Sequence, residues 1–174
     1  MTTETNPHTQ LDQQPEGSEQ RERLAADLFA LPGVEERASL ISVPGARALC
    51  LPRAVDAPAG AFLIDTEFAH LHPGRDQSLH VMLPPELVTD TIGAGWAEQH
   101  PVARRGEIPS NAVMLYAPRG DHERSVVTRL VQAAHEYASG TTVLPADQLA
   151  KRSVTGAAGR PGRPPKQPPS GPRI

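Results

Sequence analysis

The sequence predicts a single α+β domain, in which helices cover one face of an antiparallel or mixed sheet and disordered tails flank the domain. Three observations support this prediction. Apolar residues recur at helical spacing in residues 18–31 and again after Asp121. Short apolar runs bounded by turn residues lie between these two segments. The resulting order of helix, hairpin, hairpin, helix, strand and helix is typical of α+β domains, because it lacks regular alternation of strands and helices.

Composition separates the domain from its tails. Residues 1–18 are polar and contain a single leucine, so we expect a disordered segment. Residues 19–145 contain the apolar periodicity and are long enough to form one hydrophobic core. Residues 146–174 are rich in Pro, Gly and Arg and lack an apolar pattern, which predicts a flexible basic tail.

The first half of the domain begins with a helix over residues 18–31, which has acidic residues in its first turn. Two candidate strands follow at residues 39–43 and 46–51. They are joined by the Pro-Gly turn dipeptide at residues 44–45, and this arrangement predicts a first hairpin.

A second hairpin follows a loop at residues 56–60. Residues 61–72 are predicted to form a long strand, and residues 78–83 its partner. Residues 73–77 contain Pro and Gly and form the connecting loop.

The second half of the domain begins with two prolines at residues 84–85, which suit the first turn of a helix. Residues 96–101 leave this helix as an extended segment, and residues 102–110 are predicted to be a loop. Residues 111–118 form a short apolar strand. Asp121 is a plausible cap for the final helix.

The net charge of −3 conceals an asymmetry between the domain and the tail. Residues 1–150 carry −9 and residues 151–174 carry +6. The acidic part is unsuited to general nucleic-acid binding, so only the tail can supply that electrostatic attraction. Residues 160–166, RPGRPPK, resemble an AT-hook, a short basic segment that enters the minor groove of A·T-rich DNA. We expect a flexible solubilising tail there, with DNA association as the alternative.

A single cysteine, Cys50, excludes an internal disulfide and a multi-cysteine metal site. It lies in an apolar run, which indicates an inert buried thiol. The sequence has no apolar segment of roughly 18 residues and no signal-peptide pattern at its amino terminus. We therefore expect a cytoplasmic protein that does not enter a membrane. Its oligomeric state is left open.

Three histidines, His70, His72 and His80, lie on the two strands of the second hairpin. Alternate residues along a strand share a face, so His70 and His72 point the same way. If residues 73–77 form the loop, His70 lies directly opposite His80 and the three imidazoles cluster. Glu67 falls on the opposite face under strict alternation, unless a β-bulge turns the strand.

Three facing imidazoles can coordinate zinc, iron or copper and leave positions open for substrate, water or oxygen. Each ring can equally act as a general base or make a structural hydrogen bond. A metal held by His70, His72 and His80 is therefore one alternative, and the identity of the metal stays open.

Four further residues are candidates for the same pocket. His100 lies at the end of an extended segment that presents it on the same side as Trp96. Trp96 can anchor the core or form a stacking wall for an aromatic ligand. Tyr116 can present its hydroxyl group to the cavity, and Arg119 can pair with a carboxylate.

The order of these motifs resembles the luciferase-like domain family. The motifs are EFAHLHPG at residues 67–74, SLH at 78–80, GWAEQHP at 95–101 and YAPR at 116–119. The resemblance extends over about residues 31–137, nearly the whole predicted domain. It implies a catalytic role for His70, His72, His80 and His100, and a substrate-binding role for Glu67, Trp96, Tyr116 and Arg119.

The fungal luciferases of this family oxidise 3-hydroxyhispidin, a styryl pyrone, with oxygen and emit light without an added organic cofactor. They carry an amino-terminal membrane segment, which we do not expect here. The resemblance implies an oxygen-dependent oxidoreductase that acts on a small aromatic or enolic molecule, with dioxygen as co-substrate and no organic cofactor. Two alternatives remain: a non-catalytic module that binds a small ligand or metal, and a DNA-associated protein that acts through its tail.

Overall fold

The computed structural model describes residues 13–52 and 57–141 of the 174-residue chain. These residues form one α+β domain with a six-stranded sheet in the order β1-β2-β3-β4-β6-β5. All neighbouring strands are antiparallel, which confirms the predicted fold class and makes the sheet antiparallel rather than mixed. The elements are α1 (Glu19–Phe29), β1 (Glu35–Ala38), β2 (Arg47–Cys50), β3 (Glu67–Leu71), β4 (Leu79–Met82), α2 (Pro85–Gly93), β5 (Ala97–Gln99), α3 (Pro101–Arg104), β6 (Ala112–Leu115) and α4 (Asp121–Ala138).

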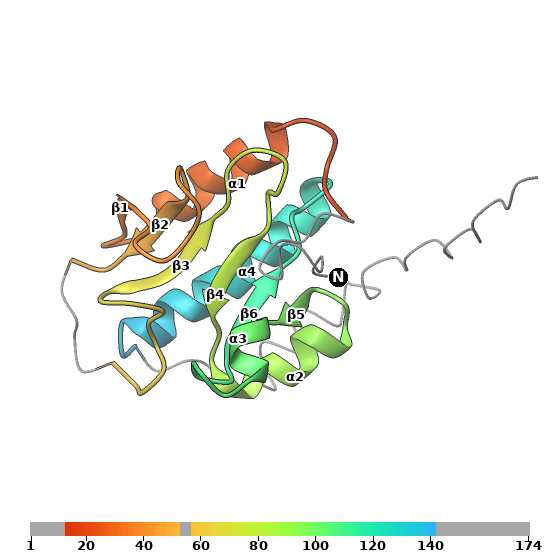
Figure 1. Ribbon diagram of the computed structural model, residues 1–174. Helices are drawn as coiled ribbons and strands as arrows, with labels where there is room; N and C mark the ends of the chain where they lie inside the picture. Colours follow the sequence, from red (N-terminus) through yellow and green to blue (C-terminus); the bar gives the residue numbers. More distant parts are fainter. Residues whose placement is uncertain (1–12, 53–56, 142–174) are drawn as a thin grey trace, which may run out of the picture.

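Two helices, α1 and α4, cover one face of the sheet. Figure 1 shows α4 running behind β3 and β4, with α1 packed alongside it. The two shorter helices, α2 and α3, lie beside β5 and β6 at the other end of the sheet (Figure 1). The opposite face of β3 and β4 is therefore not covered by α1 or α4.

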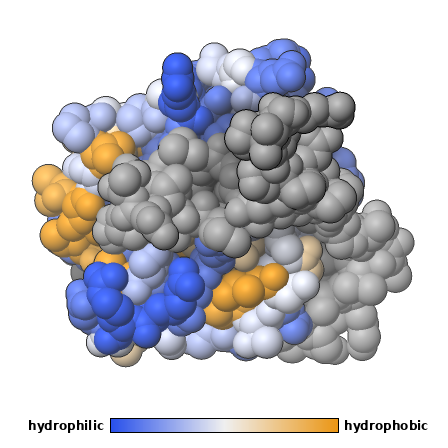
Figure 2. All heavy atoms as spheres, turned by 45° about the vertical axis from the view of Figure 1, so that its right-hand side comes forward, coloured by the Kyte–Doolittle hydropathy of each residue, from blue (hydrophilic) through white to orange (hydrophobic). Residues whose placement is uncertain are grey.

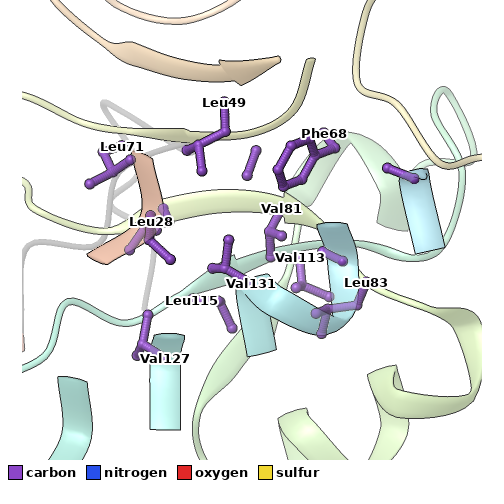
Figure 3. Close-up of a cluster of buried hydrophobic side chains, with 14 of the residues drawn as sticks. Leu28, Leu49, Phe68, Leu71, Val81, Leu83, Val113, Leu115, Val127 and Val131 are labelled. Atoms are coloured by element: carbon purple, nitrogen blue, oxygen red, sulfur yellow. The ribbon is translucent and has the colours of Figure 1, made fainter. Parts of the chain in front are cut away.

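The main hydrophobic core fills the space between the sheet and these two helices (Figure 3). Leu28 of α1 and Val127 and Val131 of α4 contribute from the helices. Strands β3, β4 and β6 contribute alternate residues, namely Ala69, Leu71, Leu79, Val81, Val113 and Leu115. Each large apolar side chain stabilises the domain by about 1.5–3 kcal/mol when fully buried. The intervening residues of the same strands must point to the other face.

The second hairpin has the predicted register. β3 and β4 pair with His70 opposite His80 and Leu71 opposite Leu79. The backbone N–H of His72 donates to the carbonyl of Ser78 over 3.1 Å, so residues 73–77 form the loop. Gly74 lies in this loop at a φ of 73°, where a side chain would be strained. The five-residue loop therefore places the three histidines on one face.

The first hairpin differs from the prediction. The strand predicted at residues 39–43 is wrong, because β1 is Glu35–Ala38 and residues 39–45 form the connection to β2. The apolar residues that suggested a strand are exposed, and Leu40 is 75% accessible. Arg47 of β2 holds Glu36 of β1 through two hydrogen bonds of 2.6 and 2.8 Å. This cross-strand ion pair favours the observed pairing.

The long strand predicted at residues 61–72 is also shorter than expected. A tight turn interrupts it, with Asp65 at a φ of 48° and an isolated bridge between Ile64 and Glu67. The backbone N–H of Leu63 donates to the carbonyl of Glu67 over 2.7 Å. The chain therefore reverses just before β3, and residues 61–64 do not extend that strand.

The helices agree with the prediction, with two differences. The predicted loop at residues 102–110 begins with a short helix, α3, which starts at Pro101, a residue suited to the first helical turn. Gly120, not Asp121, is the N-cap residue of α4. Among the described residues, no helix is both long and apolar enough to span a bilayer.

Apolar side chains on the face shown in Figure 2 gather in separate patches between hydrophilic residues. The predicted tail from residue 146 and the first 12 residues lie outside the described part.

The sequence assigned residues 13–18 to a disordered amino-terminal segment, but these residues contact the domain. Gln14 accepts a hydrogen bond from the backbone N–H of Gln77 over 2.7 Å.

Candidate functional site

The face of the sheet opposite α1 and α4 carries a row of side chains that crosses adjacent strands. Strand pairing places Ala48, His70, His80, Met114 and Glu98 in sequence across β2, β3, β4, β6 and β5. Each of these residues alternates with core residues of its own strand, so the row lies on the face away from the core. Two of the predicted histidines therefore lie at the centre of the sheet.

His72 and His100 extend this row into a cluster, which we call the histidine face (His70, His72, His80 and His100). The centroids of the rings of His72 and His80 are 4.4 Å apart, and those of His70 and His80 are 4.7 Å apart. The ring of His100 lies 4.6 Å from that of His80. None of the four residues is more than 6% exposed. The structure thus brings together all four histidines that the sequence predicted.

A β-bulge brings Glu67 to the same face. Leu49 pairs with Ala69 while the next residue, Cys50, pairs with Glu67, so β3 contains one extra residue at this point. The extra residue reverses the alternation, so Phe68 joins the core and Glu67 turns toward the histidines. Oε1 of Glu67 lies 2.6 Å from Nδ1 of His70. Strict alternation predicts Glu67 on the opposite face from the histidines unless a β-bulge turns the strand. The structure contains that bulge, so Glu67 lies on the same face as the histidines.

Glu67 is itself held in place. The hydroxyl of Ser39 donates to Oε1 of Glu67 over 2.9 Å, from the connection between β1 and β2. Burial lowers the pKa of His70 below its usual value, although the hydrogen bond to Glu67 acts in the opposite direction. The imidazole of His70 is therefore uncharged at neutral pH.

A second carboxylate, Asp76, pairs with His72. Its Oδ2 lies 2.7 Å from Nδ1 of His72, and its Oδ1 accepts hydrogen bonds from the backbone N–H and the hydroxyl of Ser78 over 3.0 and 2.6 Å. Burial raises the pKa of the Asp76 carboxyl, but the hydrogen bonds from His72 and Ser78 outweigh burial and lower it. The sequence prediction missed Asp76. Its position two residues before a serine in a turn is typical of a side chain that caps its own loop, and could have identified it.

His100 has a different hydrogen-bonding arrangement. It precedes α3, and its Nδ1 accepts a hydrogen bond from the backbone N–H of Val102 over 3.2 Å. An accepting Nδ1 places the proton of a neutral imidazole on Nε2. His100 can therefore donate a hydrogen bond from Nε2, whereas His70 and His72 can accept at that atom when Nδ1 donates to a carboxylate.

Trp96 and Tyr116 lie on the same face, in a row beside the histidines. Their backbones pair, because the N–H of Tyr116 donates to the carbonyl of Trp96 over 3.1 Å. The hydroxyl of Tyr116 donates a short hydrogen bond to Glu98, and the ring of Trp96 lies 6.3 Å from that of His122. Both candidates are therefore buried side chains on the face that carries the histidines.

Arg119 lies apart from this arrangement. Its guanidinium group pairs with Glu123 at the start of α4, through Nε over 3.0 Å, and its side chain is 35% exposed. This ion pair raises the pKa of the Arg119 side chain above its usual value. The structure thus shows Arg119, which lies just before α4, bound to a carboxylate in the first turn of that helix.

Apolar residues border the histidine face at one end. Met82 and Ala112, next to the row on β4 and β6, pack with Ala103 of α3 in a second, smaller hydrophobic cluster. A cavity of about 200 Å³ lies on the α1 side of the sheet, where Arg21 and Glu22 of α1 and Arg47 of β2 line it, and His72 borders it at the start of the loop.

Comparison with known proteins finds similarity over the segment that contains the histidine face. The model of the luciferase domain family matches residues 65–134, a segment that contains all eight predicted site residues. Over 73 residues, the chain is 33% identical to a luciferase of Armillaria mellea and 36% identical to one of Neonothopanus nambi. These matches cover 41% of this chain and 27% of each relative, so the chain spans about a quarter of the curated relatives. No solved structure matches the chain. Residues 65–134 thus match the model of the luciferase domain, and the resemblance inferred from the motifs is confirmed over this segment.

Proposed function

We propose that this protein is an oxygen-dependent oxidoreductase that acts on a small aromatic or enolic molecule. The observation that carries the proposal is the histidine face, in which four buried imidazoles and two carboxylates meet on one side of the sheet. Buried ionisable groups that converge in this way are typical of catalytic sites. The similarity to fungal luciferases supports oxidation by dioxygen as the reaction class.

The proposed chemistry begins with removal of a proton from an enol or phenol hydroxyl group. Either His70 or His80 accepts this proton at a ring nitrogen. Among residues 13–52 and 57–141, the buried Nε2 of His70 has no hydrogen-bond partner, and Glu67 holds the other ring nitrogen, as in a carboxylate–histidine dyad. The resulting anion is electron-rich. It supplies the electron pair of a new carbon–oxygen bond to dioxygen, which is reduced to the level of a peroxide.

Neighbouring groups stabilise the negative charge and position the ring. His100 can donate a hydrogen bond from Nε2 to the anion, because its Nδ1 already accepts one from Val102. Trp96 and Tyr116 provide a flat surface for an aromatic substrate. Arg119 pairs with Glu123 when no substrate is bound. We assign it a contribution to substrate binding, which requires its guanidinium group to leave Glu123.

The proposal is tested by oxygen uptake of the full chain in the presence of a panel of enolic and phenolic compounds. For any compound that supports uptake, His70→Ala, His72→Ala and His80→Ala should each reduce turnover by roughly 100-fold or more, the usual contribution of acid–base groups. The exposed His122 provides the matched control, and His122→Ala should retain turnover. Undiminished uptake in all three variants would contradict the mechanism. Stoichiometric binding of a compound without oxygen uptake would instead favour a non-catalytic ligand-binding module.

A further inference from the structure

Two histidines of the site present their ring nitrogens in the same way. Nδ1 of His70 lies against Glu67 and Nδ1 of His72 lies against Asp76, at 2.6 and 2.7 Å. When Nδ1 donates to a carboxylate, the lone pair of the ring is fixed on Nε2. The Nε2 atom of His70 is buried and makes no hydrogen bond in the described part of the chain. A buried acceptor of this kind requires a partner that the side chains do not provide.

The third histidine of the hairpin completes the arrangement. One ring nitrogen from each of His70, His72 and His80 lies within 4.8 Å of the other two. Three nitrogens bound to one ion at about 2.0–2.1 Å are separated by about 3.3 Å from one another. Modest side-chain rotations therefore bring the three atoms to ligand distance. The pairing of β3 with β4 already fixes the backbones of His70 and His80 opposite each other.

Charge at the site favours a cation. Glu67 and Asp76 are both at most 8% exposed, and they hydrogen-bond to imidazole, hydroxyl, amide and backbone N–H groups. Among the described residues, neither carboxylate forms an ion pair with Lys or Arg. Buried carboxylates are costly unless a positive charge compensates them. A divalent ion between the two dyads matches the two negative charges.

From these observations we infer that His70, His72 and His80 bind one divalent first-row transition-metal ion, with Glu67 and Asp76 as the carboxylates that orient two of the ligands. His100 is not a ligand, because its Nδ1 accepts from Val102 and its Nε2 carries the proton. Three neutral nitrogens suit zinc, iron or copper and leave positions open for a substrate hydroxyl group.

This inference deepens the proposed function and rests on it for the pocket. When the ion is bound, the three lone pairs are used as ligands. A bound ion would supply Lewis acidity that lowers the pKa of a coordinated hydroxyl group, and water would take up the released proton. Metal binding is measured without substrate, so its outcome is independent of the oxygen-uptake experiment.

The test uses the full chain, purified without a histidine tag, treated with a chelator and dialysed. Titration with Co²⁺, followed by its visible absorption, and elemental analysis after dialysis against Zn²⁺ should each give one ion per chain. The His70→Ala, His72→Ala, His80→Ala triple variant should bind none. His100→Ala and the exposed control His122→Ala should each keep one ion.

Glu67→Gln keeps the side-chain volume and removes the charge, so it tests the site even if the triple variant does not fold. Loss of an orienting carboxylate should weaken Co²⁺ binding by roughly 10–100-fold. The inference is overturned if the wild-type protein binds neither Co²⁺ nor Zn²⁺ stoichiometrically, or if Glu67→Gln binds Co²⁺ as tightly as wild type. A chain that binds no metal but consumes oxygen would refute the metal site and leave the proposed function intact.

Discussion

Asp76 offers the sharpest test of how the loop between β3 and β4 is held. The change Asp76→Ala removes the acceptor of four hydrogen bonds, one from the side-chain amide of Gln14 and three from Nδ1 of His72 and the backbone N–H and hydroxyl of Ser78. His72 and Ser78 are buried, at 5% and 0% exposure. The hydroxyl of Ser78 lies 3.3 Å from Nδ1 of His72 and can replace one interaction. The backbone N–H of Ser78 has no such replacement.

Each buried donor left without an acceptor costs about 1–3 kcal/mol. With one bond replaced, we expect Asp76→Ala to lower the free energy of unfolding by about 2–4 kcal/mol. Asp76→Asn keeps an oxygen for the N–H of Ser78 and should cost less, about 1 kcal/mol. The exposed control Asp90→Ala should change stability by no more than about 0.5 kcal/mol.

The assay is urea unfolding of the full chain in the presence of a chelator. For a domain of this size, a loss of 2–4 kcal/mol shifts the midpoint by roughly 1–2 M. The pKa of Asp76 is lowered in the folded state, so its stabilising effect is present above the ordinary Asp pKa of about 3.9 and disappears as the pH falls through the lower folded-state value. The difference between wild type and Asp76→Asn should therefore narrow below about pH 4. A midpoint for Asp76→Ala equal to that of Asp90→Ala would refute this account of the loop.

Three further predictions concern the rest of the domain. Phe68→Ala should lower the free energy of unfolding by about 3–5 kcal/mol in the same assay, because Phe68 is fully buried in the core; a loss below 1 kcal/mol would contradict the bulge that places it there. Burial raises the pKa of the Cys50 thiol, so the native protein should resist alkylation at pH 8 and react only in urea, as mass spectrometry would show; rapid native reaction would be inconsistent with this environment. Ile41→Ser should change stability by less than about 0.5 kcal/mol, because Ile41 is 48% exposed, and a large loss would indicate a buried strand at residues 39–43.

The histidine cluster could be predicted because two simple rules determine it. Side chains alternate along a strand, and a loop of five residues sets His70 opposite His80. Neither rule depends on distant parts of the chain. The partner strand β1 was harder to place, because residues 40–43 are as apolar as a strand but have no surface to pack against. A cross-strand ion pair between Glu36 and Arg47 favours the observed pairing instead.

The positions of the two carboxylates, Glu67 and Asp76, were not predicted from the sequence. The bulge at Glu67 depends on how β3 pairs with β2, and composition carries no sign of one extra residue in a strand. Asp76 acts through a local turn, so its role was readable from the sequence even though the prediction did not include it. The helix α3 has only four residues, too few to produce an apolar period.

The two edges of the sheet have a consequence for self-association. All four residues of β1 are exposed, and three of them, Glu35, Glu36 and Arg37, are charged. At the other edge, β5 has only three residues and is followed closely by Pro101. Charge, brevity and proline each hinder the addition of a strand from another molecule. We therefore expect the sheet to be a poor template for edge-to-edge aggregation, so that a concentrated sample retains discrete, unpolymerised domains.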